Sequence, residues 1–138
     1  MTGELGISSK DLCPAAGITY RQLDYWCRIR AVRPTIEASG SGSRRRWYPN
    51  DVLQVVLCSR LRRLGVLPEV MPRVIDQIAT VLGPLGTGLV VVEPCRPWRV
   101  QSLEQVQDRP GEVFAVGWLV DVGAAWLRAR EIVAEVGR

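Results

Sequence analysis

The segment Gly17-Ile-Thr-Tyr-Arg-Gln-Leu-Asp-Tyr-Trp26 contains the signals that decide the fold of this chain. Thr19 and Gln22 stand three positions apart, which is the spacing of a capping box at the start of a helix. The sequence therefore predicts a helix that begins after Thr19 and continues to about residue 30. The side chains that fall on one side of this helix at helical spacing are Leu23, Trp26, Cys27 and Arg30.

A shorter helical piece precedes this segment, at residues 9–16. Ser8 or Ser9 can cap its first turn by accepting hydrogen bonds from free N–H groups. Pro14 lies inside it and would clash with the carbonyl four residues earlier, so we expect this helix to be short or distorted. Gly17 then supplies a turn. Two short helices joined by a glycine-containing turn are the elements of a helix-turn-helix.

Two short extended runs follow, at residues 31–36 and 44–49, on either side of a Gly/Ser-rich stretch. This pattern predicts a β-hairpin with a flexible tip. Arg44-Arg45-Arg46 lies on the returning strand, where successive side chains alternate between faces, so at least one of the three must face solvent or a ligand. For the neighbouring Trp47 two interpretations stay open, packing within the hairpin and stacking on a sugar.

Two more helices and a linker complete the first half. Asn50-Asp51 predicts the start of a third helix, and Gly65 predicts its end. A fourth helix begins at Pro68 or at Pro72, the latter being either the first helical residue or a kink. The Gly/Pro-rich stretch at residues 83–88 predicts a linker.

The second half mixes strands and helices. Apolar runs predict strands at residues 89–92, 98–100 and 112–119, and helices are predicted at residues 102–106 and 121–136. A unit of about 50 residues is small for independent folding, so we expect it to pack on the first half. The predicted fold class is therefore α+β.

Composition argues against several classes of function. The 138 residues are 47% hydrophobic and 23% charged, with no apolar run of membrane-spanning length and no signal-peptide start. Histidine is absent and the four cysteines form no CxxC pair, which removes the usual general base, the His-containing triads and the common zinc or redox motifs. We therefore expect a cytoplasmic protein with no catalytic residues, no metal and no cofactor. Its cysteines are interpreted as small buried apolar side chains.

Positive charge is concentrated in the first half of the chain. The net charge of the whole sequence is +4, but residues 20–65 hold ten arginines against three acidic residues, a local charge of +7. Residues 83–138 hold six arginines against seven acidic residues. Clustered arginine is typical of phosphate binding, so the first half is predicted to bind a polyanion.

Five stretches occur in a fixed order in the first half. They are Gly17 to Trp26, Arg33-Pro34, Gly42-Ser-Arg-Arg-Arg-Trp-Tyr48, Asp51-Val-Leu and Leu61-Arg-Arg-Leu-Gly65. The ordered set resembles the winged helix-turn-helix DNA-binding domain of the MerR family over residues 8–82. This resemblance implies a DNA-binding domain at residues 1–82 and a linker at 83–88. It leaves residues 89–138 as a small α+β domain for dimerisation, sensing or contact with another protein.

The resemblance also implies which side chains contact DNA. Thr19, Tyr20 and Arg21, at the start of the second helix, match positions that face the major groove, because the first residues of a recognition helix reach base edges. Tyr25 matches an aromatic hydroxyl that contacts phosphate, and Arg46 matches the wing arginine. A basic hairpin tip can also enter the minor groove. The expected DNA-binding residues are Thr19, Tyr20, Arg21, Tyr25, Arg28, Arg44, Arg45, Arg46 and Tyr48.

The sequence departs from the MerR pattern at three places. Pro14 and Pro72 interrupt helices that the family leaves intact. Asp24 stands where the family commonly has arginine, so either it pairs with Arg21 or Arg28 or the docking on DNA differs. The glycine-rich stretch at residues 83–88 and the strands after it replace the long dimerisation helix of the family. Neither that helix nor the metal-sensing cysteines of the family are therefore implied for this chain.

Three functions from different classes remain as hypotheses. The first is a sequence-specific transcriptional regulator that binds double-stranded DNA, located at the nucleoid. The second is a phage-type excisionase or another architectural factor that bends DNA, since such factors resemble the same small winged fold. The third is an interaction module whose basic face is incidental. A second copy of the chain or another protein is an open partner for residues 89–138, and no membrane partner is expected.

Overall fold

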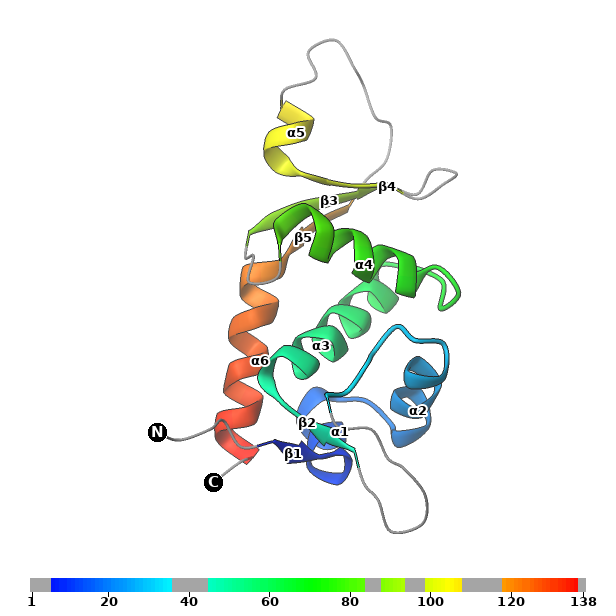
Figure 1. Cartoon of the computed structure of the whole chain (residues 1–138), viewed down its shortest axis with the longest axis vertical. Coiled ribbons are helices and arrows are strands. Elements are labelled where there is room, and N and C mark those ends of the chain that lie inside the picture. Colours follow the sequence, from blue (N-terminus) through cyan, green and yellow to red (C-terminus); the bar gives the residue numbers. More distant parts are fainter. Residues whose placement is uncertain (1–5, 36–44, 84–87, 94–98, 108–117, 137–138) are drawn as a thin grey trace.

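The computed structural model describes residues 6–35, 45–83, 88–93, 99–107 and 118–136 (Figure 1). The first half begins with β1 (Ile7–Ser8), α1 (Ser9–Ala16) and α2 (Tyr20–Arg28). Both predicted N-caps are confirmed. The Asp11 N–H donates to the Ser8 hydroxyl oxygen at 3.2 Å, and Thr19 and Gln22 exchange two hydrogen bonds of 3.1 and 3.2 Å.

The turn between α1 and α2 depends on a left-handed backbone at Gly17. Its φ is +70°, and the N–H groups of Gly17 and Ile18 donate to the carbonyls of Pro14 and Cys13. This is the usual way to satisfy the last carbonyls of a helix. Helix α1 is short, as Pro14 predicted. Helix α2 ends at Arg28, two residues before the predicted end, and Arg30 has a φ of +67°.

Gly17→Ala is expected to lower the free energy of unfolding by about 1 kcal/mol, the cost of placing an L side chain in the left-handed region. A Cβ at this position would meet no atom within 4 Å, so the loss comes from the backbone alone. Gly17→Asn should lose less, because asparagine tolerates this conformation better. Urea unfolding of the three proteins measures both differences, and equal losses for the two variants would contradict the backbone explanation.

The predicted β-hairpin is wrong in its pairing. Strand β2 (Arg46–Trp47) forms where the returning strand was expected, but its antiparallel partner is β1, with Ile7 opposite Trp47 and Ser8 opposite Arg46. The described part of the other predicted strand, residues 31–35, has no strand structure. These residues cannot form the backbone hydrogen bonds of a strand pair. Pro34 lacks an N–H, and the N–H groups of Arg33 and Thr35 donate to side chains of α3. The Gly/Ser-rich tip and Arg44 lie outside the described residues.

Helix α3 (Pro49–Arg63) starts just before the Asn50-Asp51 signal. The Asp51 side chain is buried, with the residue 2% exposed. Its oxygens accept from the Tyr48 N–H at 3.0 Å, the Thr35 N–H at 3.0 Å and the Thr35 hydroxyl at 2.8 Å. A single carboxylate therefore starts α3 and also ties the chain before residues 36–44 to the chain after them.

Helix α4 (Met71–Leu82) begins one residue before Pro72, which is the second helical residue and lies in the first turn, where proline is tolerated. The second half contains β3 (Leu89–Glu93), β4 (Arg99–Ser102), α5 (Leu103–Gln107), β5 (Trp118–Asp121) and α6 (Val122–Val136). The strands form an antiparallel sheet in the order β4-β3-β5. The last strand was predicted at residues 112–119; the described strand begins at Trp118, and residues 112–117 lie outside the described part.

Helix α6 runs from this sheet along α3 and α1 towards the end of the molecule where β1 lies (Figure 1). Arg128 of α6 donates to the Ala15 carbonyl oxygen at 3.3 Å, and buried side chains of both halves belong to one hydrophobic cluster. The expectation that the second half packs on the first is thus confirmed. The described helices include none with the length and apolarity needed to cross a membrane.

Three of the four cysteines, Cys13, Cys27 and Cys58, are buried free thiols, as predicted; Cys95 lies outside the described residues. Burial, reinforced by the neighbouring Cys27, raises the pKa of the Cys58 thiol to about 12. Burial also raises the pKa of Cys13. Protonated, enclosed thiols are packing groups and poor nucleophiles.

Candidate nucleic-acid interface

The first turn of α2 presents polar side chains outward because the opposite face of the helix is fixed in the core. Leu23 and Trp26 are at most 2% exposed, whereas Tyr20 is 60% exposed and Arg21 is also exposed. The Thr19 hydroxyl oxygen is engaged by the Gln22 N–H, so Thr19 fixes the start of the helix. Arg21 has no ion-pair or hydrogen-bond partner for its side chain among the described residues. Its guanidinium is therefore available to a ligand.

The next turn of α2 carries Tyr25 and Arg28. Tyr25 is 39% exposed, and the Arg28 guanidinium lies 5.8 Å from the centroid of its ring, within the range of a cation–π contact. Arg28 Nε also lies 3.3 Å from Asp24 Oδ2. The Arg28 side chain is 67% exposed, so it keeps most of its donors towards solvent.

Asp24 joins α2 to the chain that leads into β2. Its Oδ1 lies 3.4 Å from a terminal nitrogen of Arg45, whose side chain is only 17% exposed. The sequence left open whether Asp24 pairs with Arg21 or Arg28, and the structure selects Arg28 and adds Arg45. The pair with Arg45 is long-range and had no signal in the sequence. Its effect is to hold the basic segment before β2 against the polar side of α2.

Strand β2 alternates between surface and core. Arg46 is exposed, and the following Trp47 is fully buried and donates from its ring nitrogen to the Ser9 hydroxyl oxygen at 2.9 Å. Of the two interpretations of Trp47, packing is therefore correct. The half-buried Tyr48 ring lies against Gly6, where an added Cβ would come within 3.0 Å of it. Tyr48 thus has a packing role at the base of this segment.

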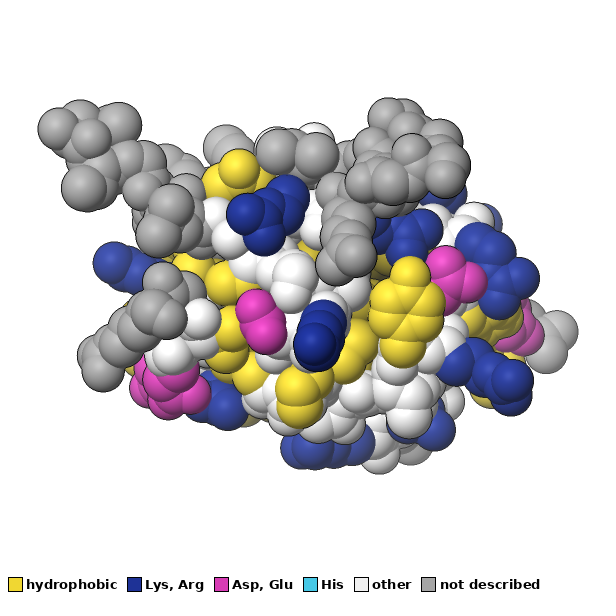
Figure 2. Space-filling model, turned by 90° about the horizontal axis from the view of Figure 1, so that it is seen from below, with side chains coloured by type: hydrophobic (Ala, Val, Ile, Leu, Met, Phe, Trp, Pro, Cys, Tyr) yellow, Lys and Arg dark blue, Asp and Glu magenta, His cyan; other side chains and the backbone are white. Residues whose placement is uncertain are grey.

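The described site residues lie on or directly beside α2 and β2, at the end of the molecule that also holds α1 and β1 (Figure 1). Figure 2 shows this end, with Lys and Arg side chains spread over the face and fewer Asp and Glu side chains between them. The cations of such a surface can bind the phosphate groups of a nucleic acid, while the exposed start of α2 contacts the edges of its bases. Sequence reasoning missed the second role of Asp51, which bridges the two ends of the segment that carries the arginines.

The fold of α1 and α2 around a tight turn defines a helix-turn-helix protein. No protein-family model matches the chain. Proteins named uncharacterized HTH-type transcriptional regulators, from Mycobacterium bovis and from two strains of Mycobacterium tuberculosis, are 44% identical to it over 63 residues. The match covers 45% of this chain and 28% of each relative, so the chain spans less than a third of the length of these relatives.

Proposed function

We propose that this protein is a transcriptional regulator that binds double-stranded DNA through α2 and the β2 segment, in the manner of a MerR-like winged helix-turn-helix. The observation that carries the proposal is the Asp24–Arg45 ion pair of 3.4 Å, which holds the basic segment beside the exposed side of α2. The names of the mycobacterial relatives support the same class of function. A regulator of this kind needs no catalytic residue.

The roles of individual side chains follow from their positions. Tyr20 and Arg21 stand at the N-terminal end of α2, the part of a recognition helix that reaches base edges in the major groove. Arg28, at the other end of α2, and Arg46, on β2, are exposed cations suited to phosphate oxygens. Tyr25 lies next to Arg28 and can add its hydroxyl as a hydrogen-bond donor to the same strand of the backbone.

Asp24 limits the positive charge of this surface. Its carboxylate contacts both Arg28 and Arg45, so part of their charge is neutralised within the protein. We infer that Asp24 acts mainly by positioning Arg45, and that the exposed Arg21 and Arg46 supply more of the contact with DNA. Arg44 and the tip of the segment are proposed to extend the contact into the minor groove.

The proposal is tested by the salt dependence of binding to a fluorescent duplex selected from a random library. If about four to six phosphates are neutralised per protomer, the log–log slope of affinity against salt should be roughly −4 to −5. Fluorescence anisotropy between low and moderate salt measures the slope. A slope near zero would contradict DNA binding, and strong bending of the same duplex in a circular-permutation assay would favour the architectural alternative.

A further inference from the structure

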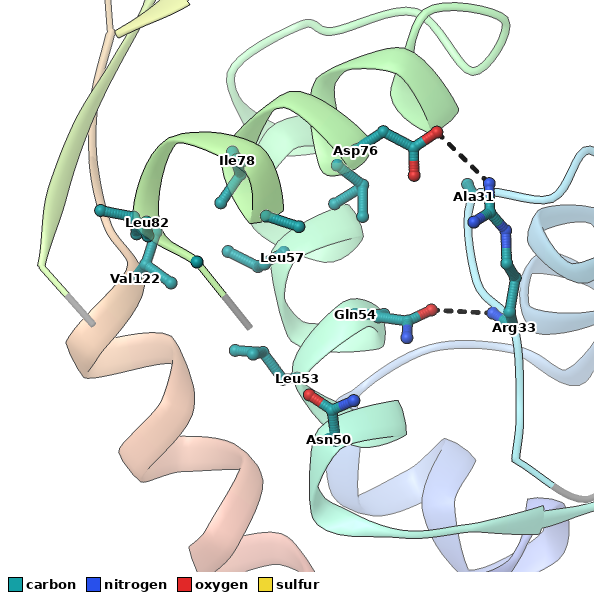
Figure 3. Close-up of a pocket in the computed structure, with 13 residues that line it drawn as sticks. Ala31, Arg33, Asn50, Leu53, Gln54, Leu57, Asp76, Ile78, Leu82 and Val122 are labelled. Atoms are coloured by element: carbon teal, nitrogen blue, oxygen red, sulfur yellow. Dashed lines mark hydrogen bonds and ion pairs between the residues drawn. The ribbon is translucent and has the colours of Figure 1, made fainter. Parts of the chain in front are cut away.

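A cavity is lined by α3, α4, the start of α6 and the chain that follows α2 (Figure 3). Its volume is about 260 Å³. Small-molecule sites in proteins are typically pockets of about 300 to 1,000 Å³ with apolar walls and a few polar groups. The cavity is thus close to the lower limit of that range and suits a ligand of few atoms.

The cavity has an apolar end and a polar end. Figure 3 shows Leu53, Leu57, Ile78, Leu82 and Val122 gathered on the side next to α6. Leu57, Ile78 and Val122 are nearly fully buried, so this wall is a rigid part of the core. A short hydrocarbon chain placed here would exchange water for contacts with aliphatic side chains, which is favourable.

Arg33, Gln54 and Asp76 form the other end (Figure 3). A terminal nitrogen of Arg33 lies 3.4 Å from Asp76 Oδ2, and both side chains are about half exposed, at 47% and 58%. The Gln54 side-chain oxygen already accepts from the Arg33 backbone N–H at 2.8 Å, which leaves its amide nitrogen as a donor. The Asn50 side chain, also at the cavity, has no hydrogen-bond partner among the described residues.

Hydrogen-bond donors therefore exceed acceptors at the polar end. Arg33, Gln54 and Asn50 all offer N–H groups, whereas the side-chain acceptors among the described lining residues are the Asp76 carboxylate and the two amide oxygens. The pair between Arg33 and Asp76 is long and exposed, and pairs of this kind contribute little stability. A ligand carboxylate can consequently replace Asp76 as the partner of Arg33 while Asp76 turns into solvent.

We propose that this cavity binds a small amphipathic molecule that ends in a carboxylate. Its hydrocarbon part lies against the apolar wall that includes Leu57, and its carboxylate accepts from the Arg33 guanidinium. This site is separate from the surface proposed for DNA. Its test uses no DNA, so failure of one proposal leaves the other standing.

Three probes of equal chain length test the head group. Octanoate, octylammonium and octanol are titrated into the full-length ¹⁵N-labelled protein, and the side-chain amide of Gln54 and the backbone amides of Arg33 and Leu82 are followed by NMR. Octanoate is expected to shift these signals saturably, with an affinity at least tenfold above that of octylammonium. No saturable shift with octanoate, or equal or tighter binding of octylammonium, would overturn the proposal.

Two substitutions on α4 test the location. Ala79 lines the cavity, and Ala79→Phe should fill it and abolish the octanoate shifts. Thr80→Phe, one residue further along and outside the cavity, is the matched control and should bind octanoate like the parent protein. Arg33→Ala should remove the preference for octanoate over octanol. Unchanged octanoate binding by a folded Ala79→Phe protein would place the site elsewhere and reject the proposal.

Discussion

Replacing Asp51 by alanine is expected to lower the free energy of unfolding by about 3 kcal/mol. The buried carboxylate accepts three hydrogen bonds, two from Thr35 and one from the Tyr48 N–H. Its removal leaves these donors without their partner, and each buried unsatisfied donor costs about 1 to 3 kcal/mol. Thr35 and Tyr48 lie on either side of the stretch that carries Arg45 and Arg46, so the loss should also loosen the attachment of that stretch to α3.

Urea unfolding followed by circular dichroism measures this effect. The matched control is Asp76→Ala, which removes an equally sized carboxylate whose ion pair with Arg33 is exposed. That change should cost less than about 1 kcal/mol. Asp51→Asn retains one acceptor oxygen and should fall between the two. Equal stability of the Asp51→Ala and Asp76→Ala proteins would show that the buried network contributes nothing beyond an exposed ion pair.

The local signals in the sequence were sufficient for the helix-turn-helix. The capping box of Thr19 and Gln22, the cap at Ser8 and the glycine turn at Gly17 all act within four residues, and each is present in the structure. Leu23, Trp26 and Cys27 of the predicted face are buried, whereas Arg30, placed on the same face by helical spacing, is exposed beyond the end of α2. These elements could be predicted because their stabilising contacts lie within the segment itself.

Strand pairing could not be predicted in the same way. The two residues of β2 pair with β1, whose paired residues lie 38 and 40 positions earlier in the chain, although a nearer extended run was available at residues 31–36. The nearer run is excluded by hydrogen bonds from its backbone to Gln54 and Asp51, both on α3. Only the packed structure shows those contacts. The same holds for the Asp24–Arg45 pair, which joins residues that are 21 positions apart.

Local helix signals could be read from the sequence and long-range strand pairing could not, so only part of the candidate site was predictable. The exposed positions of Tyr20, Arg21 and Arg28 follow from the helical period of α2, so their availability was predictable. For Arg44, Arg45 and Arg46 the sequence contained no comparable periodic pattern. Alternation predicted that at least one faces outward, and the structure shows that Arg46 does so while Arg45 is mostly enclosed.

Arg21→Ala and Arg46→Ala are expected to weaken DNA binding in distinguishable ways. Arg21 stands in the first turn of α2 and is free to reach a base edge, so its loss should cost about 1 to 3 kcal/mol, roughly 5- to 150-fold in affinity, concentrated at one base pair. Arg46 is exposed on β2 and suited to phosphate, so its loss should weaken all sequences alike and reduce the salt slope by about one.

Competition binding against a set of single-base-pair variants of the selected duplex separates these two outcomes. Arg73→Ala provides the control, because Arg73 is an exposed arginine on α4, outside the proposed surface. It removes the same charge and should change affinity little. A uniform loss for Arg21→Ala would reassign that residue to phosphate contact. Losses for all three variants that are equal in size would mean that net charge, rather than the surface built by α2 and β2, governs binding, and the proposed docking would then be wrong.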